Sequence, residues 1–258
     1  MPTRFIRYEK DGHLARVTLD RPEVLNALHP PAQAELDAIW ADFIADDDSW
    51  VALLTGAGER SFCVGADLKW RAAQAESEEV RRPSYQPHIL DTCWKPIVVA
   101  INGYALGGGL QLALRGDILV AAEGARLGLP EVRRAQLDDT GAVKLPKRIP
   151  YHLAMGLLLT GRMLSAQEAH SMGLVNEVVP AEELLPAAER WAEMMLGCSP
   201  LATQAVKQAA VTLAELPSEQ GLQRVEHLAA VRRLRASDDT VEGPRAFAEK
   251  RDPRWKGR

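Results

Sequence analysis

The 258-residue sequence predicts an α/β fold, because short apolar segments of strand length alternate along the chain with segments that have helical spacing. Three apolar runs carry the strand prediction: "WVALLTG" (50–56), "KPIVVAING" (95–103) and "GDILVAA" (116–122). Strands that alternate with helices of 10 to 15 residues are typical of crossover units in largely parallel sheets.

The first elements are predicted to be a β-hairpin and a helix. "RFIRYEK" (4–10) and "ARVTLD" (15–20) alternate apolar and polar residues on either side of a "DGH" turn. Pro30 and Pro31 then introduce a helix over 32–47. Apolar residues follow the i, i+3, i+4 spacing in it at Leu36, Ile39, Trp40, Phe43 and Ile44.

From about Ala181 onward the sequence predicts helices only. They are expected over 181–196, 199–216 and 218–236. No internal repeat and no linker rich in Gly, Ser or Pro divides the chain. We therefore expect a core over 1–195 and a helical region over 196–258 that packs on the core or on another subunit.

Composition disfavours several classes of protein. The net charge of -4 and the pI of about 5.9 give no basic face for nucleic acid. Cys63, Cys93 and Cys198 form no CxxC motif and fit buried thiols in a reducing compartment. The six histidines are scattered without metal-ligand spacing, so no metal site is predicted.

Nothing in the sequence predicts a membrane or secretory segment. The N-terminal "MPTRFIRYEKDGH" lacks the apolar stretch of a signal peptide. The most apolar region, 96–122, is interrupted by polar and charged residues. We expect a cytoplasmic protein that binds neither membrane nor nucleic acid.

The segment "NGYALGGGLQLALRGD" (102–117) places three glycines between an apolar strand and a helix. Such a run permits close backbone approach and exposes unpaired N–H groups at the helix start, which favours bound negative charge. The spacing is neither the G-x-G-x-x-G of a dinucleotide site nor that of a P-loop. A tight turn without a ligand is the alternative interpretation.

Three further motifs occur with the glycine turn: "RPEVLNAL" (21–28), "SFCVGADLKW" (61–70) and "RLGLPEVR" (126–133). The four together resemble the enoyl-CoA hydratase/isomerase (crotonase) superfamily. The resemblance continues through "LLLTGRMLSAQEAHSMGLVNEVVP" to "EGPRAFAEKRDPRWKGR" and so spans nearly the whole chain. Within the superfamily, "GADLKW" and the C-terminal block are most similar to carnitinyl-CoA dehydratase and related bacterial hydratases.

This resemblance implies a crotonase-like spiral of β-β-α units over 1–195. The helical layer over 196–258 would then be an oligomerisation region in a homotrimer or a dimer of trimers. The substrate would be an acyl-CoA, with coenzyme A as part of the substrate and no separate cofactor or metal. Backbone N–H groups would stabilise the enolate that forms from the thioester.

The resemblance also implies roles for individual residues. The oxyanion hole would consist of the N–H groups of Ala66 and Gly108. Leu25 and Lys69 would face the coenzyme A, while Phe247 and Lys250 would reach the coenzyme A of a neighbouring subunit. For the two lysines, an ordinary solvated surface position is the alternative. Asp67 is a plausible helix N-cap.

Two glutamates hold the reacting water in the hydratases that the sequence resembles. One matches Glu131, and the position of the other is occupied by Gln111. An amide can hold a water molecule but cannot take up or release a proton near neutral pH. Gln111 therefore fits hydration with one titrating carboxylate or a one-base shift of a double bond. A polar helix residue that faces solvent is the alternative.

Asp138 and Asp139, in "RRAQLDDTGAVKLP" (133–146), have two interpretations. They fit the N-cap and first turn of a helix, where negative charge is favourable. They could also point toward the acyl group and supply the second carboxylate.

The leading hypothesis is an enoyl-CoA hydratase or dehydratase. Ala66 and Gly108 would bind the thioester oxygen, Glu131 would move the proton, and Gln111 would orient water. The second hypothesis is an enoyl-CoA Δ3,Δ2-isomerase that uses Glu131 alone. The third is a CoA- or RNA-binding homologue with little catalysis, whose RNA version the acidic pI disfavours.

Overall fold

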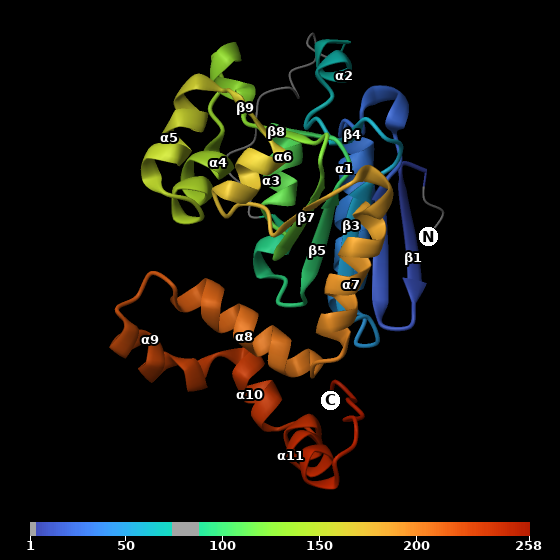
Figure 1. Cartoon of the computed structure of the whole chain (residues 1–258), viewed down its shortest axis with the longest axis vertical. Coiled ribbons are helices and arrows are strands. Elements are labelled where there is room, and N and C mark those ends of the chain that lie inside the picture. The colour runs from blue at the N-terminus through green and yellow to red at the C-terminus, as the bar shows by residue number, and fades with distance from the viewer. Residues whose placement is uncertain (1–3, 74–87) are drawn as a thin grey trace.

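Two β-sheets lie at the centre of the computed structural model, which describes residues 4–73 and 88–258 (Figure 1). The larger sheet has the strand order β1-β2-β3-β5-β7-β10, and the smaller has the order β4-β6-β8-β9. The strands of the larger sheet are β1 (Ile6–Asp11), β2 (Leu14–Leu19), β3 (Val51–Gly56), β5 (Ile97–Ile101), β7 (Ile118–Ala122) and β10 (Glu177–Val179). Those of the smaller sheet are β4 (Ser61–Cys63), β6 (Tyr104–Leu106), β8 (Arg126–Gly128) and β9 (Met163–Ser165).

The chain alternates between the two sheets, which confirms the predicted α/β fold with β-β-α units. β3, β5 and β7 are parallel neighbours in the larger sheet, and each is followed by a strand of the smaller sheet. β4, β6 and β8 are in turn parallel neighbours. The predicted hairpin is also confirmed, since β1 and β2 pair antiparallel across Gly12, which has a φ of 55°. Each β-β-α unit thus contributes its first strand to the larger sheet and its second strand to the smaller sheet.

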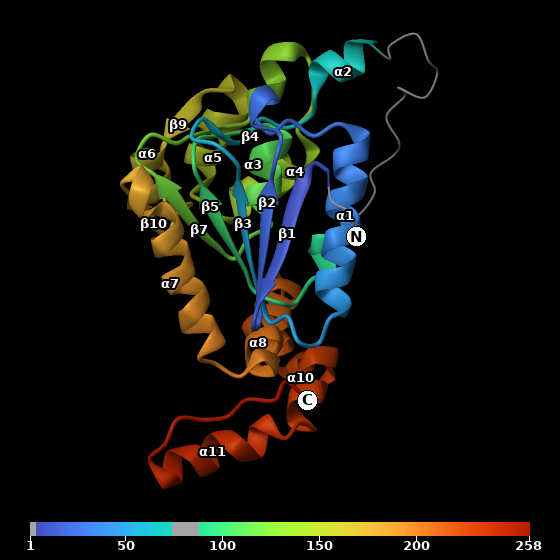
Figure 2. The same ribbon diagram turned by 90° about the vertical axis from the view of Figure 1, so that its right-hand side faces the viewer.

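Helices cover both faces of the larger sheet (Figure 2). α1 (Pro30–Ala45) packs on the face that carries Ala52 and Leu54 of β3. α7 (Leu184–Leu196) packs on the opposite face, with Val51 and Leu53. This alternation follows from the two-residue period of a strand. The helix predicted over 32–47 begins at Pro30, because proline is compatible with the first turn of a helix.

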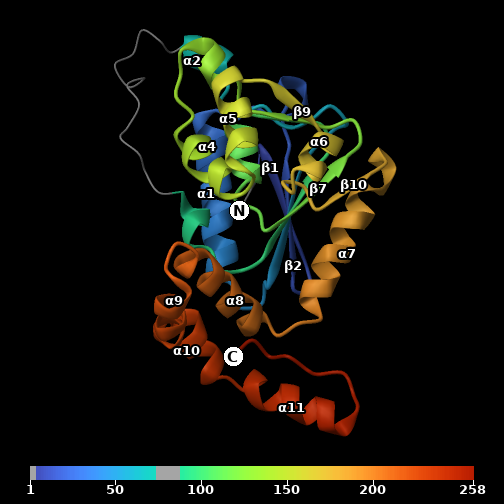
Figure 3. The same ribbon diagram turned by 60° about the vertical axis from the view of Figure 1, so that its left-hand side comes forward.

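Short helices gather around the smaller sheet (Figure 3), and α4 lies beside α3 (Figure 1). The α-helices here are α2 (Leu68–Ala73), α3 (Gly108–Ala113), α4 (Asp139–Lys144), α5 (Tyr151–Thr160) and α6 (Ala166–Ser171). The 3₁₀ helices described in the chain are η1 (Pro22–Val24), η3 (Ile89–Thr92), η4 (Pro130–Arg134), η5 (Leu145–Lys147), η6 (Ala181–Glu183) and η7 (Val225–His227).

The last helices extend away from the sheets at the end opposite to α2 (Figure 1). They are α8 (Pro200–Leu213), α9 (Ser218–Arg224), α10 (Ala229–Arg235) and α11 (Asp239–Glu249). The prediction of one helix over 218–236 is wrong, because Leu228 is extended and separates α9 and η7 from α10. A tertiary contact favours the break: the side chain of Gln208 on α8 accepts a hydrogen bond from Ala230 N at the start of α10, at 2.8 Å.

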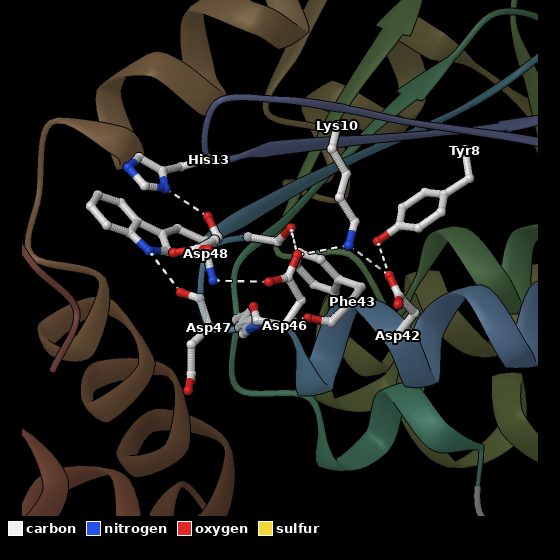
Figure 4. Close-up of polar contacts among 11 residues, drawn as sticks. Tyr8, Lys10, His13, Asp42, Phe43, Asp46, Asp47 and Asp48 are labelled. Atoms are coloured by element: carbon white, nitrogen blue, oxygen red, sulfur yellow. Dashed lines mark hydrogen bonds and ion pairs between the residues drawn. The ribbon is translucent and has the colours of Figure 1, made fainter. Parts of the chain in front are cut away.

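Polar side chains join the hairpin to the C-terminal end of α1 (Figure 4). Tyr8 donates a hydrogen bond to Asp42 at 2.9 Å, and Lys10 Nζ lies 2.7 Å from Asp46 Oδ2. Burial and the bond to Asp42 raise the pKa of Tyr8 to about 12. The buried Lys95 Nζ donates to the backbone oxygens of Phe43 and Asp46, both at 2.6 Å. The last turn of α1 is therefore held to β1 and to the segment before β5.

The three thiols are free in the structure, but only two of them are buried. Burial raises the pKa of Cys63 to about 12. The expectation of a buried thiol is wrong for Cys198, which lies exposed in the turn between α7 and α8.

Within residues 4–73 and 88–258, no helix is long and apolar enough to cross a membrane.

Candidate active site

Two glycine turns lie against each other where β4 and β6 lead into α2 and α3. Gly65 and Gly107 both have positive φ values, of 82° and 54°, which favour glycine. A Cβ on Gly65 would lie 2.7 Å from Gly108 N, so the two backbones approach more closely than any side chain allows. The glycine run is thus required for the contact between the two turns and for the start of α3.

The N–H groups of Ala66 and Gly108 lie close together at this contact. A Cβ on Gly108 would be 3.8 Å from Ala66 N. The neighbouring backbone groups are paired: Leu28 N donates to Gly65 O at 2.8 Å, and Asp67 N donates to Leu28 O at 3.0 Å. Within the described part of the chain, neither Ala66 N nor Gly108 N donates a hydrogen bond. Two such donors can bind one oxygen that carries negative charge.

Glu131 brings a carboxylate to the same place. It lies in the first turn of η4, directly after β8 and Pro130, and is half-buried. A Cβ on Gly107 would be only 2.8 Å from Glu131 Oε1. The carboxylate therefore lies against the residue that precedes the Gly108 N–H, and a side chain there would displace the end of Glu131.

Gln111 lies one helical turn after Gly107, and its backbone N donates to Gly107 O at 3.0 Å. Its side chain is half-buried and bonded, so a purely solvent-facing role is wrong. Nε2 donates to Asp138 Oδ1 at 2.7 Å. Asp138 is 7% exposed, and burial raises the pKa of its carboxyl group.

The structure bears out one of the two interpretations of Asp138, the helix N-cap. Its Oδ1 accepts a hydrogen bond from Gly141 N at 2.7 Å, which confirms the predicted N-cap of α4. The same oxygen accepts the bond from Gln111. Asp139, by contrast, is exposed in the first turn and bonds only its neighbour Thr140 among the described residues.

The known proteins that match this chain come from one family. The family model described as enoyl-CoA hydratase/isomerase matches residues 9–258. The chain belongs to this family. It is 43% identical to the (E)-benzylidenesuccinyl-CoA hydratase of Thauera aromatica, over 98% of this chain and 99% of the relative. It is 40% identical to the carnitinyl-CoA dehydratase of Proteus mirabilis, over 96% of each chain.

Solved structures of enoyl-CoA hydratases share the fold. The enzyme from Mycobacterium tuberculosis is similar with a TM-score of 0.89 and 35% identity, over 98% of this chain and 99% of the other. The enzyme from Bacillus anthracis is similar with a TM-score of 0.89 and 36% identity, over 99% and 100% of the chains. The predicted crotonase-like fold, the superfamily and the similarity to carnitinyl-CoA dehydratase are confirmed.

In this hydratase/isomerase family member, the segment 21–28 is attached directly to the Ala66 turn. Leu28 and Ala66 form a parallel bridge, and Leu25 and Asn26 have positive φ values of 57° and 56°. Asn26 is 1% exposed; its side chain donates to Ser61 O at 2.7 Å and accepts from Arg21 N at 2.9 Å. Sequence reasoning missed Asn26, although asparagine is enriched at positive φ.

The remaining predicted contacts to coenzyme A lie in two places. Lys69 is exposed on α2, whose predicted N-cap is confirmed because Trp70 N donates to Asp67 Oδ1 at 3.1 Å. Phe247 is 87% exposed on α11, and Lys250 ends this helix with a φ of 54°. In one chain α11 lies at the opposite end from α2 and α3 (Figure 1), so Phe247 and Lys250 do not join the other site residues.

Proposed function

We propose that the chain is an acyl-CoA lyase that adds or removes water across the 2,3 bond of an enoyl-CoA. The observation that carries the proposal is the placement of the Glu131 carboxylate against Gly107, beside the N–H groups of Ala66 and Gly108, which have no partner among the described residues. Acid–base chemistry next to a bound thioester needs these two groups together. The names of the two relatives, a hydratase and a dehydratase acting on CoA thioesters, support water transfer.

Each residue has a distinct part in the proposed reaction. The thioester oxygen accepts hydrogen bonds from Ala66 N and Gly108 N, which stabilise the charge that develops there by about 3 kcal/mol for each donor. Glu131 moves the proton between water and the acyl chain. Gln111 orients the water or the substrate hydroxyl, because an amide can bond both without titrating. No metal or separate cofactor enters this scheme, and coenzyme A is part of the substrate.

We further propose how coenzyme A and a second subunit are arranged. Leu25 and Lys69 lie on the two segments that flank the Ala66 turn, so they are placed to contact coenzyme A in the same chain. The exposed Phe247 and Lys250 reach the coenzyme A of a neighbouring subunit in a homotrimer or dimer of trimers. Residues 196–258 would then form the oligomerisation region outside a core of residues 1–195.

Gln111 favours a second candidate, an enoyl-CoA Δ3,Δ2-isomerase. Moving a double bond needs one base that removes a proton and returns it, and Glu131 alone supplies that group. In this alternative Gln111 has no water to hold.

The test is mass spectrometry of 2-enoyl-, 3-enoyl- and 3-hydroxyacyl-CoA after incubation with the protein in deuterated water. The proposal predicts gain of water by the 2-enoyl thioester, and loss by the 3-hydroxyacyl thioester, at rates that fall in Glu131→Gln. Conversion of 3-enoyl- to 2-enoyl-CoA without water transfer would instead establish the isomerase. If the protein catalyses neither reaction with any of the three thioesters, the remaining hypothesis is a CoA-binding homologue with little catalysis.

A further inference from the structure

We propose that Asp138 is a positioning residue that acts through Gln111: its carboxylate holds the amide so that Gln111 presents its Oε1 to the reacting water or hydroxyl. The inference deepens the proposed function and rests on it. The inference gives Gln111 a role at the position where the hydratases that this sequence resembles have a glutamate.

The direction of the hydrogen bond determines how the amide is turned. Asp138 in its ionised form has acceptors only, whereas an amide has a donor end and an acceptor end. The contact of 2.7 Å to Asp138 Oδ1 therefore requires Gln111 Nε2 on that side. Oε1 is then the end that is left for the site, and it accepts a hydrogen bond from a water molecule or a substrate hydroxyl.

The Asp138 carboxylate is itself fixed in place. Its Oδ1 accepts two hydrogen bonds of 2.7 Å, from Gln111 Nε2 and Gly141 N. Its Oδ2 lies next to the position that a Cβ on Gly141 would take, and Leu129 Cδ1 lies on another side of that position. Within the described residues Oδ2 is buried and accepts no hydrogen bond. A carboxylate enclosed in this way orients a neighbour and is poorly placed to exchange protons with the substrate.

The backbone of Gln111 is held by a second set of charged groups. Arg115 donates from its guanidinium to Gln111 O at 2.9 Å. Asp91 Oδ1 lies 3.4 Å from Arg115 Nε and 2.6 Å from Lys144 Nζ on α4. α4 is thus tied to α3 directly through Asp138, and Lys144 at its other end shares Asp91 of η3 with Arg115. Gln111 is held at both its backbone and its side chain.

Two substitutions separate positioning from proton transfer. Asp138→Asn keeps an oxygen that accepts from both Gln111 and Gly141, but it has no carboxyl group to titrate. Asp138→Ser keeps the N-cap, since serine is a good capping residue, but its short side chain does not reach Gln111. Asp139→Ser, in the exposed neighbour, is the matched control.

The measurement is kcat and KM for hydration of a 2-enoyl-CoA by the full-length wild type and the three variants. Melting temperatures are recorded to show that each variant is folded. We expect Asp138→Ser to lower kcat by about 10- to 100-fold with little change in KM, because the amide loses its orientation. Asp138→Asn should stay within about threefold of wild type and keep its pH profile, because the Oδ1 contacts remain. Asp139→Ser should match wild type.

Each other outcome contradicts the inference. If Asp138→Ser hydrates as fast as Asp139→Ser, Asp138 does not position Gln111. If Asp138→Asn and Asp138→Ser lose activity equally, the carboxyl group itself takes part in proton transfer. If the wild type transfers no water, the proposed function fails and the positioning role fails with it. If the wild type is active and only the variants depart from the expected rates, the positioning role alone fails.

Discussion

Glu131 Oε1 lies so close to Gly107 that a Cβ on this glycine would be 2.8 Å from the carboxylate oxygen. The acid therefore lies next to the residue that precedes the first N–H of α3. Gly107 also has a φ of 54° and a ψ of -129°, a conformation that side-chain-bearing residues rarely adopt.

We predict that Gly107→Ala displaces Glu131 and strains the turn. Hydration should fall by about tenfold or more, and the free energy of unfolding should fall by about 1–3 kcal/mol. Steady-state kinetics and urea unfolding check both values. Gly124→Ala is the control, because nothing lies within 4 Å of a Cβ there and its φ is not positive. Equal kinetics for the two variants would show that the Gly107 contact does not position the acid.

Gly65→Ala tests the pair of backbone donors. The new Cβ would lie 2.7 Å from Gly108 N, at an atom proposed to hold the thioester oxygen. We expect kcat to fall by about 10²- to 10³-fold, as for loss of one oxyanion donor. Calorimetry with a CoA thioester product should show a much smaller change in Kd. A variant with normal kcat would exclude Gly108 N–H as an oxyanion donor.

Asn26→Ala tests whether the segment 21–28 is held through one buried side chain. The change removes the side-chain donor to Ala57 O and one of two donors to Ser61 O, which keeps its bond from Asn102 Nδ2. It also removes the acceptor for Arg21 N, and we expect a loss of about 2–4 kcal/mol in the free energy of unfolding. KM for enoyl-CoA should rise, because Leu25 is adjacent. Asn26→Asp keeps the acceptor for Arg21 N but lacks the donor. Wild-type stability in the aspartate variant would contradict the importance of these two bonds.

His88 predicts a pH dependence of stability. Burial lowers the pKa of His88 to about 4, and the positive charge of Arg115 contributes. The unfolded chain, with a histidine pKa of about 6.5, binds the proton first, so stability falls as pH drops from about 6.5 to about 4. In the folded state Leu90 N donates to His88 Nδ1 at 3.2 Å, a bond that protonation breaks.

His88→Asn keeps a capping acceptor and removes the titration. Between pH 7 and pH 4.5, wild type should lose about 1–3 kcal/mol more unfolding free energy than this variant. Urea unfolding at the two pH values gives the difference. Parallel losses in both proteins would show that His88 is not responsible.

Local patterns were sufficient to predict the α/β fold and its apolar strands, and the resemblance to the crotonase superfamily implied the spiral, but neither gave every boundary. β3, β5 and β7 are apolar on both faces because α1 and α7 cover the sheet, and uninterrupted apolar runs reveal such strands directly. At the break after Leu228, Ala230 N donates to Gln208, which lies on another helix, and helical periodicity over 218–236 gives no sign of this contact.

The site was predictable only where a motif fixes the backbone. Gly65, Gly107 and Gly108 belong to short glycine turns, and their conformations follow from residue type. The bond between Gln111 and Asp138 joins residues 27 positions apart, and the sequence left two roles open for the acid. Only the packing of α4 on α3 shows that one oxygen serves as the N-cap and as the partner of Gln111.

The most direct test of the central claim compares Glu131→Gln with Glu123→Gln, an exposed glutamate on the loop after β7. The measurement is the rate of water addition to a 2-enoyl-CoA. If Glu131 moves the proton, its amide variant should lose about 10²- to 10⁴-fold in kcat while the control is unchanged. Equal rates in the two variants would contradict the assignment of Glu131 as the catalytic acid–base group.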